Sequence, residues 1–503
     1  MKTAIANNSG QALILCLLLA GAAALASLLL FNSGLLANTK TQLQNAADAG
    51  AYSGAVMLAR DHNFSAYANR AMVANQVAVA QLVSLESYLE DAANTRNRMN
   101  NRVQSDQARI PVTPGAWEIA KMSPIQITTV YNAYRAIAPT AVQSIDKLIH
   151  AFAEAQRTHH TVTAENVMLI VDEVVKKNDP EAGVSTGAFQ LGTTLAQRDR
   201  WRDQYTKQYS ANDSSAAADR FANVVVSEQS TDAFTRDRRS SPLPSWRSVP
   251  KPSYCKGGRP FYTSFSFEHR GGTILSSDKK RWLALDATLG SGRYICIYMV
   301  GKVPVPVPRR LRDPSSTGSG GSGGAVAGRG GDYADRYGFS GNPRPTRLYG
   351  NALREVRAPA EARYRSGPGT SLDAAGGLQP TYRDIADFLN LPANQSPELN
   401  GGQMPITVEV ERGQASVRTS STFLGGATNI RLDPQMKGAS MRTLSSAHAF
   451  FYRPNQNSSA FTRTGWKRAD GRTEMANLFN PYWQARLRDR TEGERDASFG
   501  AQN

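Results

Sequence analysis

The sequence predicts an α+β protein: a single N-terminal transmembrane helix, a helical stalk or bundle, and an antiparallel β-rich domain with a long flexible insertion. Three observations support this prediction. No residue between Lys2 and Lys40 is charged, helix-forming sequence continues to about residue 220, and alternating apolar and polar residues follow. The order of these three kinds of sequence along the chain gives the expected order of the domains.

The N-terminal apolar run covers residues 12–31. As a helix it would span about 30 Å, the thickness of a hydrocarbon core. A signal peptide could be cut at residues 24–26 (Ala-Leu-Ala), but the apolar run continues to Phe31. A pilin-like leader would be cut after Gly10, yet the glutamate expected five residues later is Leu15. An uncleaved anchor fits the length best.

Composition divides the chain into consecutive segments. A short head with one lysine before the span favours a cytoplasmic N-terminus, with the C-terminal bulk on the other side. The expected segments are a cytoplasmic head (1–11), the transmembrane helix (12–31), a helical region (32–220), a β-rich domain (221–303 and 404–490), a Pro/Gly/Arg-rich, partly disordered insertion (304–403) and a tail (491–503).

The helix after the span carries two rows of small residues. No proline interrupts residues 38–85, and small residues recur there every four positions. Two such rows side by side let another helix approach closely. That helix could belong to a partner protein or a second copy of the chain, or it could be the following stretch near residues 64–89. The rows are Ala46, Gly50, Gly54 and Ala47, Ala51, Ala55.

At these residues the sequence resembles a known family. A GQALIL start, an uncharged span and the stretch LQNAADAGAYSGAV are similar to the N-terminal domain of TadG-like Flp pilus-assembly proteins of the bacterial Tad (tight adherence) machinery. The resemblance covers roughly residues 8–80, with the TadG-like N-terminal domain itself placed at 32–80. It implies a bacterial inner-membrane protein with its bulk in the periplasm and with pilus-assembly or envelope proteins as partners. It implies no enzymatic activity.

Larger members of this family can carry a von Willebrand A-type domain, whose metal site uses an Asp-x-Ser-x-Ser pattern after a buried strand. The nearest match here, residues 313–317, reads Asp-Pro-Ser-Ser-Thr and is followed by GSGGSGG. Such a Gly/Ser-rich stretch is typical of a linker rather than the end of a core strand. We therefore expect no metal site there.

Beyond residue 221 the pattern predicts antiparallel strands. Residues 261–277 alternate and contain Gly271-Gly272, which suits a hairpin turn, and residues 282–303 have the same character. Residues 446–454 form a further candidate strand. The stretch 405–420 should place Ile406, Val408 and Val410 on one face and Thr407, Glu409 and Glu411 on the other, water-facing side.

Prolines shape three further predictions. Pro139 predicts the start of a helix within residues 123–178, and NDPEAG (178–183) predicts a helix end. PVPVP (304–308) predicts an extended edge or polyproline segment. The stretch 312–377 lacks periodicity, and a short helix is expected near 382–391.

Large apolar residues crowd the C-terminal region. They predict docking on the chain's own domain or, alternatively, a short aromatic helix that binds a partner's groove. The residues are Leu478, Phe479, Tyr482, Trp483 and Leu487.

Three cysteines are present. Cys16 lies in the apolar run, whereas Cys255 and Cys296 lie in strand-like sequence. In an oxidising compartment the latter two would form a disulfide that closes a loop of about 40 residues. The alternative is two unrelated buried thiols. No CxxC or Cys/His spacing typical of zinc sites occurs.

The six histidines prompt a search for catalysis. No HExxH, GxSxG or Walker motif occurs, and Glu409, Glu411 and Asp433 could pair as acid and base only in principle. We expect structural or solvated histidines and no catalytic, cofactor-binding or metal-binding residue. No compact basic block with interleaved aromatics occurs, so nucleic acid is not an expected partner.

The sequence therefore predicts a non-enzymatic, inner-membrane-anchored component of Flp/Tad-type pilus assembly or anchoring. Its Ala/Gly face would pack against partner helices, and its periplasmic domain would be presented to pilus or envelope components. The net charge of +16 supports an alternative, an exported adhesin or envelope-binding module that holds anionic wall polymers with its basic Gly-rich arm. A third class, an envelope hydrolase, has no motif in its support.

Overall fold

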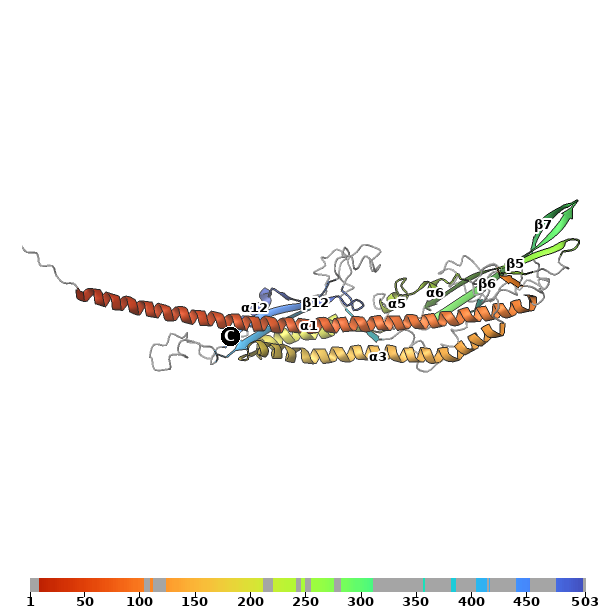
Figure 1. Ribbon diagram of the computed structural model, residues 1–503. Helices are drawn as coiled ribbons and strands as arrows, with labels where there is room; N and C mark the ends of the chain where they lie inside the picture. The colour runs from red at the N-terminus through yellow and green to blue at the C-terminus, as the bar shows by residue number, and fades with distance from the viewer. Residues whose placement is uncertain are drawn as a thin grey trace, which may run out of the picture. The chain divides into compact units, whose positions relative to one another are not determined.

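The computed structural model confirms an α+β protein with a long N-terminal helix, a second long helix and antiparallel sheets (Figure 1). It describes residues 9–103, 109–111, 124–210, 220–240, 246–248, 255–275, 282–310, 356–357, 381–385, 404–413, 416, 440–452 and 476–500. The chain divides into two compact units. Unit 1 comprises Met1–Tyr67, Ala155–Gln208 and Arg383–Asn503, and unit 2 comprises Ala68–Glu154 and Tyr209–Tyr382.

Helix α1 (Ser9–Val103) is one uninterrupted helix of 95 residues. Its sequence contains no proline and is rich in Ala and Leu, which are strong helix formers. The apolar run and the small-residue rows therefore belong to the same helix (Figure 1). The stretch near residues 64–89 continues this helix and is not a second helix that could fold back onto the rows.

Helix α3 (Pro124–Asn178) is also a single helix, so the prediction that a helix begins at Pro139 is wrong. Proline removes one helical hydrogen bond, but its neighbours Ala138 and Val142 are buried and hold the backbone in place by packing. The helix ends at Asn178, directly before the Asp-Pro pair, as predicted.

Unit 1 contains a four-stranded antiparallel sheet in the order β12-β11-β10-β2. Its strands are β12 (Trp483–Arg488), β11 (Met441–Phe451), β10 (Met404–Arg412) and β2 (Ala182–Val184). Ile406, Val408 and Val410 lie in one hydrophobic cluster with residues of α1 and α3. Each such side chain contributes about 1.5–3 kcal/mol when fully buried.

The opposite face of this sheet is polar and is covered by short helical elements. These are η1 (Gln190–Thr194), α4 (Leu195–Arg200) and α12 (Glu492–Gly500), which occupies most of the expected tail. The following element η2 (Trp201–Tyr205) instead places Trp201 in the hydrophobic cluster with α1 and α3. Ser498 of α12 donates a 2.5 Å hydrogen bond to Glu409, whose side chain is buried. The prediction of a water-facing Glu409 is therefore wrong, because alternation cannot show that a polar face is covered by a distant helix.

The aromatic C-terminal segment forms strand β12 and its approach, not a helix. Leu478 and Trp483 are buried in the core of unit 1, and the indole N–H of Trp483 donates to the carbonyl of Asn477 at 3.0 Å. The segment thus docks on the chain's own unit. The segment is therefore not the short helix that was the alternative prediction for binding in a partner's groove.

Unit 2 contains a six-stranded sheet in the order β1-β4-β5-β6-β7, with β8 also paired to β6. All pairings between the described strands of this sheet are antiparallel. The strands are β1 (Arg109–Pro111), β4 (Trp246–Ser248), β5 (Arg259–Leu275), β6 (Trp282–Val300), β7 (Val303–Arg310) and β8 (Val356–Arg357). Segments 221–303 and 404–490, expected to share one domain, thus contribute to two different sheets.

The hairpin turn predicted at Gly271-Gly272 is wrong, because β5 passes through these residues and pairs with β6 along its length. Glycine is needed at 271 for a different reason. A Cβ there would lie 2.0 Å from the Oδ1 of Asp286 and 3.0 Å from the Nε of Arg238. The absent side chain makes room for a buried ion pair rather than for a turn.

The insertion expected at 304–403 lies largely outside the described residues. Its first residues form the edge strand β7, as PVPVP predicted, and pair with β6. Thr381–Asp384 form strand β9 where a helix was expected. The remaining short elements are β3 (Lys207–Ser210), α5 (Arg220–Val225) and α6 (Ala233–Arg236).

Candidate functional site

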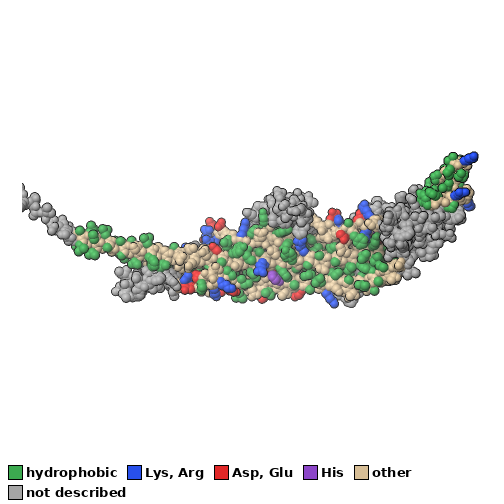
Figure 2. All heavy atoms as spheres, in the orientation of Figure 1, with side chains coloured by type: hydrophobic (Ala, Val, Ile, Leu, Met, Phe, Trp, Pro, Cys, Tyr) green, Lys and Arg blue, Asp and Glu red, His purple; other side chains and the backbone are tan. Residues whose placement is uncertain are grey.

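The apolar part of α1 is the one helix among the described residues that is long and apolar enough to cross a membrane. No part of its most apolar 18-residue window is buried, unlike the core helix of a soluble protein. Figure 2 shows hydrophobic side chains along this part of α1. A signal sequence would satisfy the same criteria of length and composition, so the structure supports a membrane segment without fixing its processing.

The small-residue rows lie directly after this segment, in the core of unit 1. Ala46, Ala47, Ala51 and Ala55 are fully buried in the cluster that α1 forms with α3 and β10. Cβ atoms added at the two glycines would lie 2.7 Å from Val175 (Gly50) and 2.9 Å from Ile406 (Gly54). The chain's own α3 and β10 therefore occupy this face, which corresponds to the intramolecular alternative.

Next on α1, unit 1 holds a buried polar cluster around Asp61. Both carboxylate oxygens accept hydrogen bonds from α3, at 2.9 Å from Nδ1 of His159 and 2.8 Å from Nδ1 of His160. The guanidinium of Arg383 on β9 lies 3.6 Å from the same carboxylate. One acidic side chain thus ties together α1, α3 and β9.

Burial governs the protonation of this cluster. Burial alone would raise the pKa of Asp61, but the hydrogen bonds from His159 and His160 and the charge of Arg383 hold it well below its usual range. Burial lowers the pKa of His62 to about 3 and also lowers the pKa of His160. At neutral pH the cluster is therefore an Asp⁻/Arg⁺ pair with neutral His62 and His160.

Asp61, His160 and Thr206 follow the atom order of a hydrolytic triad. Nε2 of His160 lies 3.0 Å from the Oγ1 of Thr206, opposite the bond to Asp61. The carbonyls of Arg202 (2.8 Å) and Trp201 (3.1 Å) also lie within hydrogen-bond distance of this hydroxyl, which has one proton to donate and is buried. A nucleophile must reach a substrate. This hydroxyl caps a helix end instead, so the arrangement is structural.

Unit 2 contains a second buried histidine–carboxylate cluster. Nδ1 of His269 lies 3.2 Å from Asp91 of α1, and Nε2 lies 3.0 Å from Asp286 of β6. Arg238 completes the cluster with two hydrogen bonds to Asp286, at 2.7 and 2.8 Å. Burial would lower the pKa of His269, but the two carboxylates raise it to about 9. This histidine is therefore an imidazolium at neutral pH.

A groove of about 600 Å³ lies beside α1 on strands β11 and β12 of unit 1. Arg486 and Arg490 line it together with Asp48 and Asp489. Arg486 donates a hydrogen bond to His448 and Arg490 to the carbonyl of Leu444, and no ion pair among the described residues joins either arginine to a carboxylate. His448 is neutral there, because burial and the charges of Arg486 and Arg488 lower its pKa to about 4. The groove therefore presents guanidinium groups suited to a carboxylate or phosphate.

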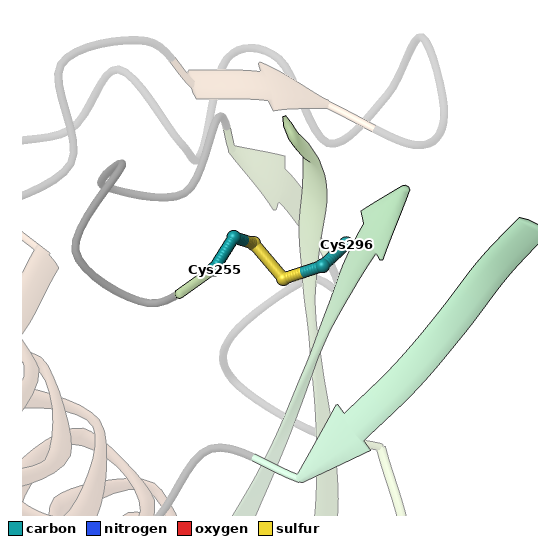
Figure 3. The surroundings of a disulfide bond; sticks show 2 residues. All are labelled: Cys255 and Cys296. Carbon is teal, nitrogen blue, oxygen red and sulfur yellow. A yellow bond between two sulfur atoms is a disulfide. The ribbon is translucent and has the colours of Figure 1, made fainter. Parts of the chain in front are cut away.

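Cys255 and Cys296 form a disulfide, with Cα atoms 5.6 Å apart (Figure 3). It joins the start of the turn before β5 to the buried side of β6. Cys16 is an exposed free thiol on the apolar part of α1.

Sequence reasoning missed the two histidine–carboxylate clusters. Their members come from segments as far apart as Asp61 and Arg383, and no spacing rule connects them. The adjacent histidines His159 and His160 were a local signal for one of the clusters. Asp433 lies outside the described residues, and Glu411 binds Ser440 and Arg442 rather than a second acid. No group of three or more His, Cys, Asp or Glu in the described part of the chain is arranged to hold a metal ion.

Comparison with known proteins finds a family match for the N-terminal segment. Residues 10–57 match the family model described as "Putative Flp pilus-assembly TadE/G-like". The match covers the apolar run and the small-residue rows and confirms the resemblance found in the sequence. No curated protein and no solved structure matches the chain.

Proposed function

Because residues 10–57 are a TadE/G-like segment, we propose that this chain is a membrane-anchored, non-enzymatic component of Flp pilus assembly. Residues 12–31 stay in the inner membrane, the short N-terminal head lies in the cytoplasm, and the rest of unit 1 and all of unit 2 lie in the periplasm. The mechanism is mechanical: the anchor fixes unit 1, and unit 1 presents a surface to pilus or envelope components.

The observation that carries this proposal is the continuity of α1. The helix passes without a break from the exposed apolar window to Leu43, the first fully buried residue of the unit 1 core. At 1.5 Å per residue, Phe31 and Leu43 are about 18 Å apart along the axis. A continuous helix transmits force and orientation between membrane and head, which a flexible linker would not do.

The internal packing of the small-residue rows fits this role. Because Gly50 and Gly54 bring α1 against α3 and β10, the anchor helix is itself a core element of unit 1. Pulling on the anchor would load this core directly. Homo-oligomerisation through the same rows would require α3 to be displaced, so we propose contacts through other surfaces.

The first experiment is the intact mass of the protein extracted from membranes. A full-length mass of 54.5 kDa supports a permanent anchor. Loss of residues 1–26 would contradict it and favour the exported binding module. Cleavage after Gly10 would indicate pilin-type processing and incorporation into the pilus itself.

Topology is tested by the native cysteines. With the bulk of the chain in the oxidising periplasm, Cys255 and Cys296 should resist alkylation in whole cells until a reductant is added. Alkylation of both thiols without reductant would place the units in the cytoplasm and contradict the proposal.

The groove lined by Arg486 and Arg490 is a surface of unit 1 that could bind an acidic partner. Arg486→Glu should reduce pilus assembly while leaving protein abundance unchanged, because it reverses a charge at an exposed position of β12. Lys147→Glu, on an exposed site of α3, makes the same charge change away from the groove and serves as the control. Equal assembly with both variants would remove the groove from the mechanism.

A further inference from the structure

The β6–β7 hairpin exposes apolar residues that the anchor and the pilus-assembly role do not explain. Val300 pairs with Val303 across a two-residue turn in which Gly301 has a φ of 64°. Strand β5 pairs with β6 only as far as Ile297. The hairpin tip, residues 298–305, therefore extends beyond the rest of its sheet.

Both faces of the hairpin tip are apolar and open. Alternation places Val300, Val303 and Val305 on one face and Met299 with Pro304 on the other. Met299, Val300 and Val303 are 61–67% exposed. Figure 2 shows the hydrophobic side chains of this hairpin at the surface. Exposed apolar patches of this kind mark protein or membrane contact sites.

The free edge of β7 is not suited to pair with another strand. Successive N–H groups of a strand point to opposite edges. Val303, Val305 and Val307 alternate with prolines, and the ladder to β6 needs the valine N–H groups. Pro304, Pro306 and Pro308 therefore fall on the free edge, which has no N–H donor at these positions. This edge therefore cannot pair with an added strand. Because the prolines have no N–H group, it also has no donor at these positions that an apolar medium would leave without a partner.

Lys302 is the one charged residue of the hairpin tip, residues 298–305. In the sequence, the stretch 287–312 contains no acidic residue and four further basic ones: Arg293, Arg309, Arg310 and Arg312. Lys302 is exposed in the turn, and its long stem lets the ammonium group stay among head groups while its neighbours lie deeper. Apolar residues combined with basic ones bind anionic lipid surfaces.

We propose that the hairpin tip inserts into the interface of an anionic lipid bilayer. A protein partner would normally cover one face of a two-stranded hairpin and leave the other in water. Here both faces are apolar and the edge lacks donors, so a medium that surrounds the tip fits better. This contact is separate from the transmembrane anchor and does not depend on the pilus-assembly role.

The test uses the full-length chain held by its own anchor in a nanodisc. In a Cys16→Ser background, an environment-sensitive fluorophore is attached to the cysteine of the Val300→Cys variant. The labelling control is the Glu173→Cys variant, because Glu173 is an exposed side chain of α3. Spin-labelled quencher lipid is placed either in the nanodisc, made with phosphatidylglycerol, or in added phosphatidylglycerol vesicles. Intact mass confirms that Cys255 and Cys296 remain paired.

We expect quenching at position 300 and none at position 173. Quenching by nanodisc lipid means that the tip binds the anchor's own membrane, and quenching by vesicle lipid means that it binds a second membrane. Either result supports the proposal. Quenching by neither overturns it and leaves a protein as the occupant.

Variants distinguish insertion from chance contact. Met299→Ser with Val303→Ser should abolish the quenching, and Lys302→Glu should weaken vesicle binding at least tenfold, with neutral phosphatidylcholine vesicles giving no signal in any variant. Leu169→Ser removes an equally exposed apolar side chain from α3 and should change nothing. Unchanged quenching in the Met299/Val303 double variant would also overturn the proposal.

Discussion

Gly50 of α1 lies so close to Val175 of α3 that a Cβ on the glycine would be 2.7 Å from the valine Cγ2. Real Cβ atoms do not approach that closely. Valine is stiff at χ1 in a helix, so it cannot turn its methyl group away cheaply. The two helices are in contact only because position 50 has no side chain.

The first prediction is that Gly50→Ala destabilises unit 1. Alanine favours the helix by up to about 1 kcal/mol over glycine, but overpacking a core typically costs about 1–3 kcal/mol, so a net loss of up to about 2 kcal/mol is expected. The measurement is hydrogen exchange of α3 and β10 peptides in the full-length protein in detergent.

Gly34→Ala is the matched control. It lies on the same helix, and no atom lies within 4 Å of its added Cβ. This variant should keep the helix-propensity gain and leave α3 exchange unchanged or slower. Identical exchange in the two variants would show that the close approach at Gly50 is not maintained in solution.

Such contacts set the limit of sequence-based prediction here. The apolar run, the small-residue rows and the alternation of Ile406, Val408 and Val410 are local patterns, and each predicted its element correctly. The identity of the segment that fills the rows is not local. Val175 lies more than 100 residues along the chain from Gly50, and nothing in the spacing of the glycines identifies it as the contact.

Predictions of secondary structure from glycine and proline were the least reliable, because each residue was assigned the structural role that it has most often, a turn or a helix start. Gly271 allows the Arg238–Asp286 ion pair inside a strand, and Pro139 lies within a helix that tertiary packing maintains. Glu409 was placed in water because the residues that cover it, on α12, are nearly 90 positions away. In each case a long-range contact overrode a correct local rule.

A second prediction concerns the Asp61 cluster. Asp61→Asn leaves Arg383 buried without its counter-charge and sets an amide against the histidine N–H groups. Breaking a buried pair from one side costs about 3–5 kcal/mol. We expect faster exchange in α3 around His159 and lower protein abundance in membranes. Glu173→Gln, which breaks an exposed pair with Lys177, should have no such effect, and equal behaviour of the two variants would argue against a structural role for Asp61.

A third prediction concerns the disulfide. Replacing Cys255 and Cys296 by serine frees a loop with a sequence separation of 41 residues, and the chain-entropy model gives a loss of about 4 kcal/mol for that length. The loss should be confined to unit 2, so exchange should accelerate in β5 and β6 while β10 and β11 stay protected. Cys16→Ser is the control, and uniform acceleration in both sheets would contradict the prediction.

The fourth prediction is a loss of unit 2 stability as pH rises through the range 6.5 to 9. His269 is held as an imidazolium between Asp91 and Asp286, which raises its pKa from 6.5 to about 9. A raised pKa means that the folded state binds the proton more tightly than the unfolded state. The stabilisation is therefore complete below pH 6.5, falls between pH 6.5 and 9, and is absent above pH 9, with an upper bound of about 3 kcal/mol.

The measurement is the denaturant midpoint for exposure of β5 and β6 peptides to protease, compared at pH 6 and pH 9.5. His269→Gln should lower the midpoint at pH 6 and remove most of the difference between the two pH values, because glutamine cannot carry the proton. His150→Gln is the control, since the His150 side chain is 46% exposed and should leave the difference intact. If His269→Gln kept the full pH difference, the titrating group would lie elsewhere, and His269 would contribute packing rather than charge.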